Sequence, residues 1–442
     1  MFDVLGSTGR THCDSRSRRS FLRVGALGVG GLTLANLLRA ESAGKVRSHK
    51  SVIMVYLSGG MAHQDTFDPK PNAPGEVRGE FKAIATALPG VQFGEYVPSL
   101  AKIADKLIVV RSVVGQPDEH SSWMSYTGTP MDAAKREHKP HFGSVVAKLQ
   151  GQTDPVMPAF IDLTPTMQHK PYNSAGPARL GRSAAGVRVD GDEVSVMKNL
   201  AIPADRLADR RGLLAEMDGL KKTAERVGTS GVDTFHDRAF DVLTSSRMVE
   251  ALDLTKESTR LRDRYGKGSP KHLGDGAPLW NEQLLMARRL VEAGARVVTL
   301  GYGFWDTHGN NFQHLKEHLP TFDRGISALV EDLHVRGLSD DCTVVVWGEF
   351  GRTPKINKDA GRDHWSRVNF ALMSGGGMKE GQVIGSTDAI AGEAKSDPIP
   401  YPSVLATVYK NLGLDPHGMV EDITARPNPI LASQYAPIEK AY

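Results

Sequence analysis

The stretch Ala295–Asn311, ARVVTLGYGFWDTHGNN, joins an apolar run to a group of polar side chains. The apolar run that ends at Leu300 is typical of a buried strand. Asp306 and His308 come after it, two residues apart, with glycine and asparagine behind them. The pair is either a polar turn or one half of a metal site. The choice depends on the side chains at the ends of the chain's other apolar runs.

Apolar runs alternate with amphipathic segments over most of the sequence, and this alternation predicts the fold class. We expect further strands at 51–60, 106–114, 342–352 and 367–377, and helices at 281–294, 312–337 and 401–414. Strands without polar alternation, separated by helices, indicate a mostly parallel sheet that is covered on both faces. The sequence therefore predicts a three-layer α/β/α sandwich.

Between about residues 151 and 276 the strand pattern weakens. Helical periodicity at 206–227 and 235–254 is separated from DPVMPAFIDL by glycine and proline. We expect a helical insertion that caps the sheet, within a single domain that covers residues 44–442.

The first 43 residues resemble an export signal. Arg18 and Arg19 precede a mild apolar run of about fifteen residues, which is shorter than the roughly twenty needed to span a bilayer. Small residues near 40–43 suit a cleavage site. We therefore expect export by the twin-arginine machinery to the periplasm or the extracellular space. Cys342 would then be the only cysteine of the mature chain, which excludes an intramolecular disulfide.

The charge balance narrows the class of partner. The formal net charge of the 442 residues is +3, and the arginines of the signal segment outnumber its acidic residues. The remainder is near neutral, so the composition gives no argument for nucleic-acid binding. A dinucleotide cofactor is not indicated either, because no G-x-G-x-x-G comes after the first expected strand.

Four polar clusters lie at the ends of the expected strands, and the first two have both a structural and a chemical interpretation. GGMAHQDTFDPKP contains His63 and Asp65, which form either half of a cation site or a loop whose carboxylates bind backbone amides. DEHSSWMSYTGTP places Asp118 and His120 before two serines. This second cluster either activates a nucleophile or begins a helix.

Asp306 and His308 form the third cluster, and GEFGRTPKINKDAGRDHW is the fourth. The fourth contains Glu349, Arg352, Asp363 and His364. A guanidinium near a metal suits an oxyanion, although Arg352 and Glu349 could equally form an ordinary ion pair. Ligands collect at the carboxyl ends of parallel strands. Four clusters at such positions together favour a metal site.

Several of these segments also resemble a known family. LLMARRLVEAGARVVTL, WDTHGNN, GEFGRTPKIN, GRDHW and SGGGMKEGQVIGSTD together resemble the exported bacterial family called domain of unknown function 1501. The resemblance covers nearly the whole mature chain. That family is grouped with the alkaline phosphatase superfamily, which includes sulfatases, phosphodiesterases and phosphoglycerate mutases. The resemblance implies an alkaline-phosphatase-like sandwich with metal at the carboxyl ends of the strands.

The superfamily pattern implies roles for individual residues. Asp306 and His308 match an aspartate and a histidine that bind one metal. Glu349 stands where the pattern has the aspartate of a second metal-binding pair, whose histidine is replaced here, and His364 matches a later histidine. The place of the usual hydroxyl nucleophile falls near Asp118. With these departures the resemblance implies metal binding, but it does not imply the two-metal mechanism with a covalent nucleophile.

The sequence and the resemblance together predict an exported, metal-dependent hydrolase of sulfate or phosphate esters, with a small molecule or a sulfated or phosphorylated glycan as substrate. The expected ligands of a divalent cation (zinc, manganese, iron or calcium) are Asp306, His308, His364, Glu349, Asp65, His63 and Asp363. We expect His120 to move a proton, Asp118 to occupy the nucleophile's place and Arg352 to neutralise the anion. The alternative is a binding or structural protein that keeps the fold and a metal without turnover.

Overall fold

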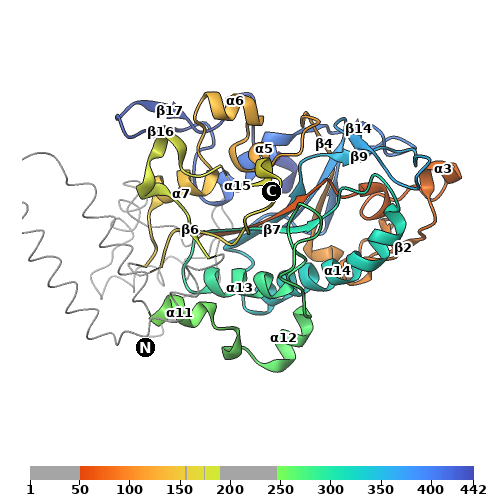
Figure 1. Ribbon diagram of the computed structural model, residues 1–442, viewed down its shortest axis with the longest axis horizontal. Helices are drawn as coiled ribbons and strands as arrows, with labels where there is room; N and C mark the ends of the chain where they lie inside the picture. Colours follow the sequence, from red (N-terminus) through yellow and green to blue (C-terminus); the bar gives the residue numbers. More distant parts are fainter. Residues whose placement is uncertain (1–49, 155–156, 174, 190–245) are drawn as a thin grey trace, which may run out of the picture. The chain divides into compact units, whose positions relative to one another are not determined.

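The computed structural model describes residues 50–154, 157–173, 175–189 and 246–442 (Figure 1). The expected signal segment, the helix at 206–227 and most of the segment at 235–254 lie outside the described residues. The described residues all belong to one compact unit. None of the described helices is both long and apolar enough to cross a membrane.

A nine-stranded sheet forms the centre of the fold, with strand order β12-β4-β11-β8-β1-β7-β5-β6 and β15 beside β4. Its strands in chain order are β1 (Ser51–Ser58), β4 (Ile108–Val114), β5 (Phe160–Asp162), β6 (Val187–Arg188), β7 (Val297–Phe304), β8 (Cys342–Gly348), β11 (Asn369–Gly375), β12 (Gln382–Ile384) and β15 (Ile399–Pro400). β1 pairs in parallel with β7 and β8, whereas β11 runs antiparallel to β4 and β8. The prediction of a mostly parallel sheet is confirmed.

Helices cover both faces of this sheet (Figure 1). One face carries α4 (Pro98–Lys102), α11 (Ser246–Leu252), α12 (Thr259–Tyr265), α13 (Asn281–Glu292) and α14 (Asn311–Val335). The other face carries α5 (Trp123–Thr127), α7 (Phe142–Gln150) and α15 (Tyr401–Asn411), while α3 (Gly75–Arg78) and α6 (Met131–Arg136) lie in connections. The predicted three-layer α/β/α sandwich is therefore confirmed.

The central strand β1 shows why its sequence does not alternate. Every residue of Ser51–Ser58 is buried. Ile53 and Val55 belong to the core under α13 and α14, and Val52 and Met54 belong to the core under α7 and α15. Successive side chains of a strand point to opposite faces, so a strand covered on both sides must be apolar throughout.

The structure differs from the predicted elements at two places. Residues 160–188, within the expected insertion, add β5 and β6 to the sheet, so that segment is not helical throughout. The strand expected at 342–352 ends at Gly348, and β9 (Gly351–Arg352) pairs instead with β10 (His364–Trp365). This small hairpin brings Arg352 opposite His364 at the edge of the sheet.

Three further two-stranded ribbons lie outside the main sheet. Their strands are β2 (Ala83–Ala85) with β3 (Gln92–Gly94), β13 (Ser386–Thr387) with β14 (Ala394–Ser396), and β16 (Met419–Glu421) with β17 (Pro427–Pro429). The first of these ribbons borders a polar hollow that Gln64 and Arg78 also line.

The single cysteine of the described chain gives a direct test of the core. Cys342 is buried, and burial raises the pKa of its thiol to about 12. We expect native protein carrying Cys13→Ser to show no reaction with Ellman's reagent at pH 8, because the reactive thiolate is absent. The same protein in guanidinium chloride should release one equivalent of chromophore. Rapid labelling of the native protein would contradict the burial of β8.

Candidate metal centre

Four side chains converge beyond the carboxyl ends of the sheet strands: His120, Asp306, His308 and His364. One potential ligand atom from each lies within 4.8 Å of those of the other three. Asp306 and His308 come directly after β7, His120 comes shortly after β4, and His364 lies on β10. β4, β7 and β8 point the same way, so the cluster lies at the edge where the sequence predicted a site.

The distances within the cluster suit one small cation. His308 Nε2 lies 3.0 Å from His364 Nε2 and 3.1 Å from Asp306 Oδ1. His364 Nε2 lies 3.2 Å from the same oxygen, and His120 Nε2 lies 3.3 Å from Asp306 Oδ2. A tetrahedral ion with bonds of 2.0–2.1 Å places its ligand atoms about 3.3 to 3.4 Å apart. His308 Nε2, His364 Nε2 and Asp306 Oδ1 therefore have nearly this spacing, and His120 Nε2 approaches the other oxygen of the same carboxylate.

Two of the imidazoles are oriented by carboxylates on their outer side. His308 Nδ1 lies 2.8 Å from Asp363 Oδ1, which also accepts a hydrogen bond from Asn357 Nδ2 at 3.1 Å. His364 Nδ1 lies 3.0 Å from Asp118 Oδ1. An ionised carboxylate only accepts hydrogen bonds, so the proton belongs on Nδ1 and the lone pair on Nε2. Metal-binding histidines are commonly held in this way.

His120 has a similar arrangement with more deeply buried partners. Its Nδ1 lies 3.3 Å from Glu349 Oε1 and 2.7 Å from the Tyr172 hydroxyl. Glu349 Oε1 also accepts the backbone N–H of Gly59 at 2.6 Å, while Oε2 has no hydrogen-bond partner among the described residues. Burial lowers the pKa of His120, but hydrogen bonds to Asp306 and Glu349 outweigh it and raise the pKa to about 9.

Arg352 holds Asp306 from within the protein. Its side chain is fully buried and donates to Asp306 Oδ1 and to the backbone carbonyls of Gly59, Gly60 and Arg362. Burial raises the pKa of Asp306, but hydrogen bonds from two histidines and Arg352 lower it well below its usual range. The expectation that Arg352 meets a substrate anion is corrected, because its guanidinium is enclosed and bound to the protein's own acceptors.

Asp65 and His63 lie outside the cluster, which corrects their expected role as ligands. Asp65 forms a bidentate pair with Arg362, with Oδ1 to Nη2 and Oδ2 to Nε both at 2.8 Å. Asn311 Nδ2 also donates to Asp65 Oδ2 at 2.8 Å. His63 is buried with Nε2 2.9 Å from Ala391 O, and burial lowers the pKa of its imidazole. These side chains stabilise the loop after β1.

Three other expected site residues contact the histidines of the cluster and offer no ligand atom to it. They are Glu349, Asp363 and Asp118. His120, expected as a proton carrier, also offers a potential ligand atom. Sequence reasoning missed Tyr172, because it lies in the segment assigned to the insertion and carries no motif.

Three residues that adjoin the expected site residues in the sequence have packing or helix-start roles. The ring centroid of Phe350 lies 4.3 Å from that of His364 and 5.2 Å from that of His120. Ser121 and Ser122 are buried, and Ser121 Oγ accepts the N–H of Trp123, the first residue of α5. These serines therefore belong to a helix start, as in the structural interpretation of their segment.

The sequence matches a family model described as "Protein of unknown function (DUF1501)" over residues 49–440, and the chain belongs to this family. The resemblance noted in the sequence is thereby confirmed. No curated protein matches the sequence.

Solved structures with similar folds are distant in sequence. The chain is 12% identical to the lipoteichoic acid synthase LtaP from Listeria monocytogenes, with a TM-score of 0.33 over 83% of this chain and 73% of that chain. It is 13% identical to the PsFucS1 sulfatase from Pseudoalteromonas sp., with a TM-score of 0.34 over 96% and 75%. It is 12% identical to the phosphonate monoester hydrolase SpPMH from Silicibacter pomeroyi, with a TM-score of 0.36 over 84% and 74%. These similarities are too distant to transfer a substrate or a mechanism.

Zinc titration tests the roles assigned by the geometry. We expect the wild type to bind one equivalent of zinc. The double variant that combines His308→Ala with His364→Ala should bind none, because it lacks two of the four ligand atoms. Asp363→Asn should weaken zinc binding by about 10- to 100-fold, since it removes the carboxylate that orients His308. His138→Asn, at an exposed histidine outside the cluster, is the matched control. Unchanged affinity in the double variant would contradict the site.

The pair between Asp65 and Arg362 predicts a loss of stability instead. Asp65→Asn leaves the fully buried guanidinium without its counter-charge, so we expect the free energy of unfolding to fall by about 3–5 kcal/mol. Urea unfolding of metal-free protein, followed by tryptophan fluorescence, measures the change. Asp363→Asn, at an exposed carboxylate, should lower stability by less than about 1 kcal/mol. Equal effects of the two variants would show that Asp65 has no special structural role.

Proposed function

We propose that this member of the DUF1501 family is an exported hydrolase with one divalent cation, and that zinc is the ion that fits best. The carrying observation is the convergence of three imidazole Nε2 atoms and the carboxylate of Asp306, with an acidic partner behind each imidazole. Nitrogen donors suit zinc, manganese or iron. They suit calcium poorly, because calcium takes oxygen ligands.

The chain's own residues prepare this site. An ion of this kind supplies Lewis acidity, which polarises an ester oxygen and lowers the pKa of a coordinated water. Arg352 fixes Asp306 and balances its charge, while Asp363 and Asp118 keep the protons of His308 and His364 on Nδ1. The rings of Phe350 and Tyr172 pack against His120 and restrict water on that side. Because these contacts already hold the ligand side chains in place, metal binding would need no rearrangement of them.

The charges around the cluster favour singly charged esters. Four carboxylates, those of Asp118, Asp306, Glu349 and Asp363, lie in or against the cluster, and Arg352 is the cation that contacts it among the described residues. With a divalent ion added, the site still has no excess positive charge. A dianionic phosphate monoester would therefore be repelled more strongly than a sulfate ester or a phosphodiester. We propose the latter two as the substrate classes.

A comparison of three chromogenic esters tests this function. We expect zinc-loaded protein to hydrolyse bis-p-nitrophenyl phosphate or p-nitrophenyl sulfate faster than p-nitrophenyl phosphate. His364→Ala should lower kcat/KM by more than about 100-fold, because it removes a ligand, whereas His138→Asn should leave it unchanged. If folded protein with one bound zinc turns over none of the three, the hydrolase proposal fails for these ester classes. A binding or structural role would then be favoured.

A further inference from the structure

The carboxylate of Glu349 is supported differently from the two other carboxylates behind the histidines. The side chains of Asp363 and Asp118 are 52% and 56% exposed, so water can complete their hydrogen bonds. The side chain of Glu349 is 2% exposed, and the protein itself must supply its donors. It does so for Oε1, which accepts the N–H of Gly59 at 2.6 Å and lies 3.3 Å from His120 Nδ1. No hydrogen bond reaches Oε2 among the described residues.

Tyr56 carries a group in the same state, a buried hydroxyl with no hydrogen-bond partner among the described residues. The residue is fully buried near the end of β1, three positions before Gly59. The parallel pairing of β1 with β8 places Tyr56 beside Trp347, two positions before Glu349. Burial raises the pKa of Tyr56 well above its usual value, and the charge of Glu349 raises it further. The carboxylate therefore lies near this hydroxyl.

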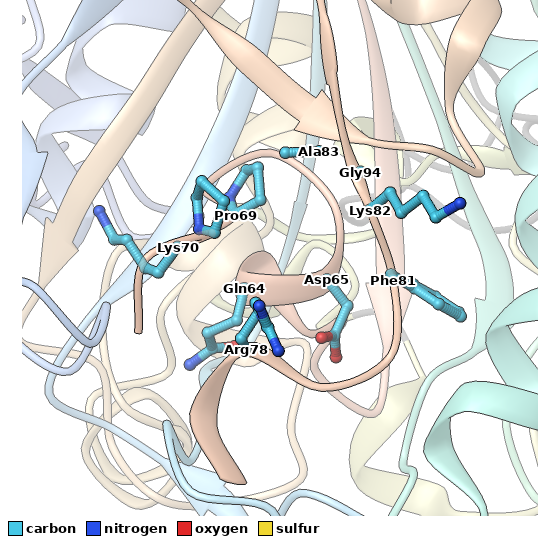
Figure 2. A pocket seen from close by; sticks show the side chains of 10 residues that line it. Gln64, Asp65, Pro69, Lys70, Arg78, Phe81, Lys82, Ala83 and Gly94 are labelled. Atoms are coloured by element: carbon cyan, nitrogen blue, oxygen red, sulfur yellow. The ribbon is translucent and has the colours of Figure 1, made fainter. Parts of the chain in front are cut away.

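The two unbonded groups are complementary. A tyrosine hydroxyl has one proton to donate, and an ionised carboxylate oxygen only accepts. Leaving both unbonded in the interior is unfavourable, because each has given up its hydrogen bonds to water. Both residues are buried and neither lines the polar hollow beside the loop after β1 (Figure 2), so bulk water does not supply the missing donor. The Gly59 N–H already holds the Glu349 carboxylate over the end of β1, so joining it to Tyr56 requires no movement of a strand.

We propose that Tyr56 is a positioning residue of the metal centre, whose hydroxyl donates to Glu349 Oε2 and fixes that carboxylate against His120 Nδ1. An ion takes the lone pair of His120 Nε2, so the proton of the ring lies on Nδ1 and needs an acceptor. Glu349 is that acceptor, and Tyr56 and Gly59 together hold it in place. Tyr56 itself touches neither the ion nor a substrate. The inference rests on the metal centre of the proposed function and not on ester hydrolysis.

Other buried donors near Glu349 suit this role less well. The Tyr172 hydroxyl lies 2.7 Å from His120 Nδ1, so it is engaged with the imidazole itself. The Tyr401 hydroxyl donates to a backbone carbonyl of β8 at 2.8 Å. The indole N–H of Trp347 is buried and unbonded, but its ring is stacked on that of Tyr401, with centroids 4.3 Å apart, and its proton cannot rotate as a hydroxyl proton can.

Tyr126 offers a matched control. It is also fully buried, and its hydroxyl also has no hydrogen-bond partner among the described residues. Burial raises the pKa of Tyr126, but the charge that adds to this effect is that of Asp162 and not that of Glu349. Replacing either tyrosine with phenylalanine removes the same atom from a buried ring, so the two variants differ only in their relation to Glu349.

Zinc titration of these variants tests the proposal. Tyr56→Phe should weaken zinc binding by about tenfold, the lower end of the range for groups that orient a metal ligand. Glu349→Gln should weaken it at least as much, because it replaces the acceptor of the His120 proton. The combined variant should bind zinc within about twofold of Glu349→Gln alone, because Tyr56 acts through Glu349. Tyr126→Phe should bind zinc as the wild type does, and circular dichroism checks that each variant is folded.

Cobalt(II) loading gives a readout that a purely structural role would not change. The visible absorption of bound cobalt reports the geometry of its ligands, so Tyr56→Phe should alter the spectrum and Tyr126→Phe should not. Unchanged zinc affinity and cobalt spectrum in Tyr56→Phe would overturn the proposal. Equal losses in the two tyrosine variants would also overturn it, as would losses from Tyr56→Phe and Glu349→Gln that multiply in the combined variant.

The same titrations separate this inference from the proposed function. If the wild type binds no zinc, the metal centre fails, and the positioning role of Tyr56 fails with it. If the wild type binds zinc and Tyr56→Phe binds it equally well, only the positioning role fails. A tenfold loss in Tyr56→Phe, in protein that binds zinc but hydrolyses no ester, would support the positioning role while the hydrolase proposal fails.

Discussion

The buried contact between Arg352 and Asp306 joins the parts of the chain on which the candidate centre depends. The guanidinium binds the carboxylate at the end of β7, the carbonyls of Gly59 and Gly60 after β1, and the carbonyl of Arg362 before β10. A buried charge is tolerated only with a partner and satisfied hydrogen bonds. Here one arginine meets both conditions while fixing three segments that are far apart in the sequence.

The close approach of these segments also dictates residue types. Gly59 has φ of +94°, and a Cβ there would lie 2.5 Å from the backbone nitrogen of Asp306. Any other residue would push the end of β1 away from the aspartate. Phe350 limits the space on another side of the cluster, because its ring lies against the imidazoles of His364 and His120.

The sequence predicted those parts of the fold that depend on long apolar runs. The continuous burial of β1 and the amphipathic pattern of α14 are properties of single segments, so they are visible without a structure. β5, β9 and β10 were missed because strands of two or three residues carry no measurable period. The polar residues at the ends of the expected strands likewise indicated that Asp306, His308 and His364 would lie near one another.

The wrong expectations all concern partners distant in the chain. Asp65 has the chemistry of a ligand, but Arg362, almost three hundred residues later, occupies both of its oxygens. Arg352 has the chemistry of an anion receptor, but its burial could not be read from its neighbours. That His120 also offers a potential ligand atom was missed, because its short distances to Asp306 and Glu349 exist only in the folded chain.

Anomalous X-ray diffraction at the zinc edge, from crystals of the zinc-loaded protein, would locate the ion at the candidate metal centre. We expect one strong peak within about 2.0–2.2 Å of His120 Nε2, His308 Nε2, His364 Nε2 and an Asp306 oxygen. Asp363, Asp118 and Glu349 should remain behind the histidines. A peak coordinated by His63 or Asp65, or full zinc loading with no peak at the cluster, would contradict this expectation.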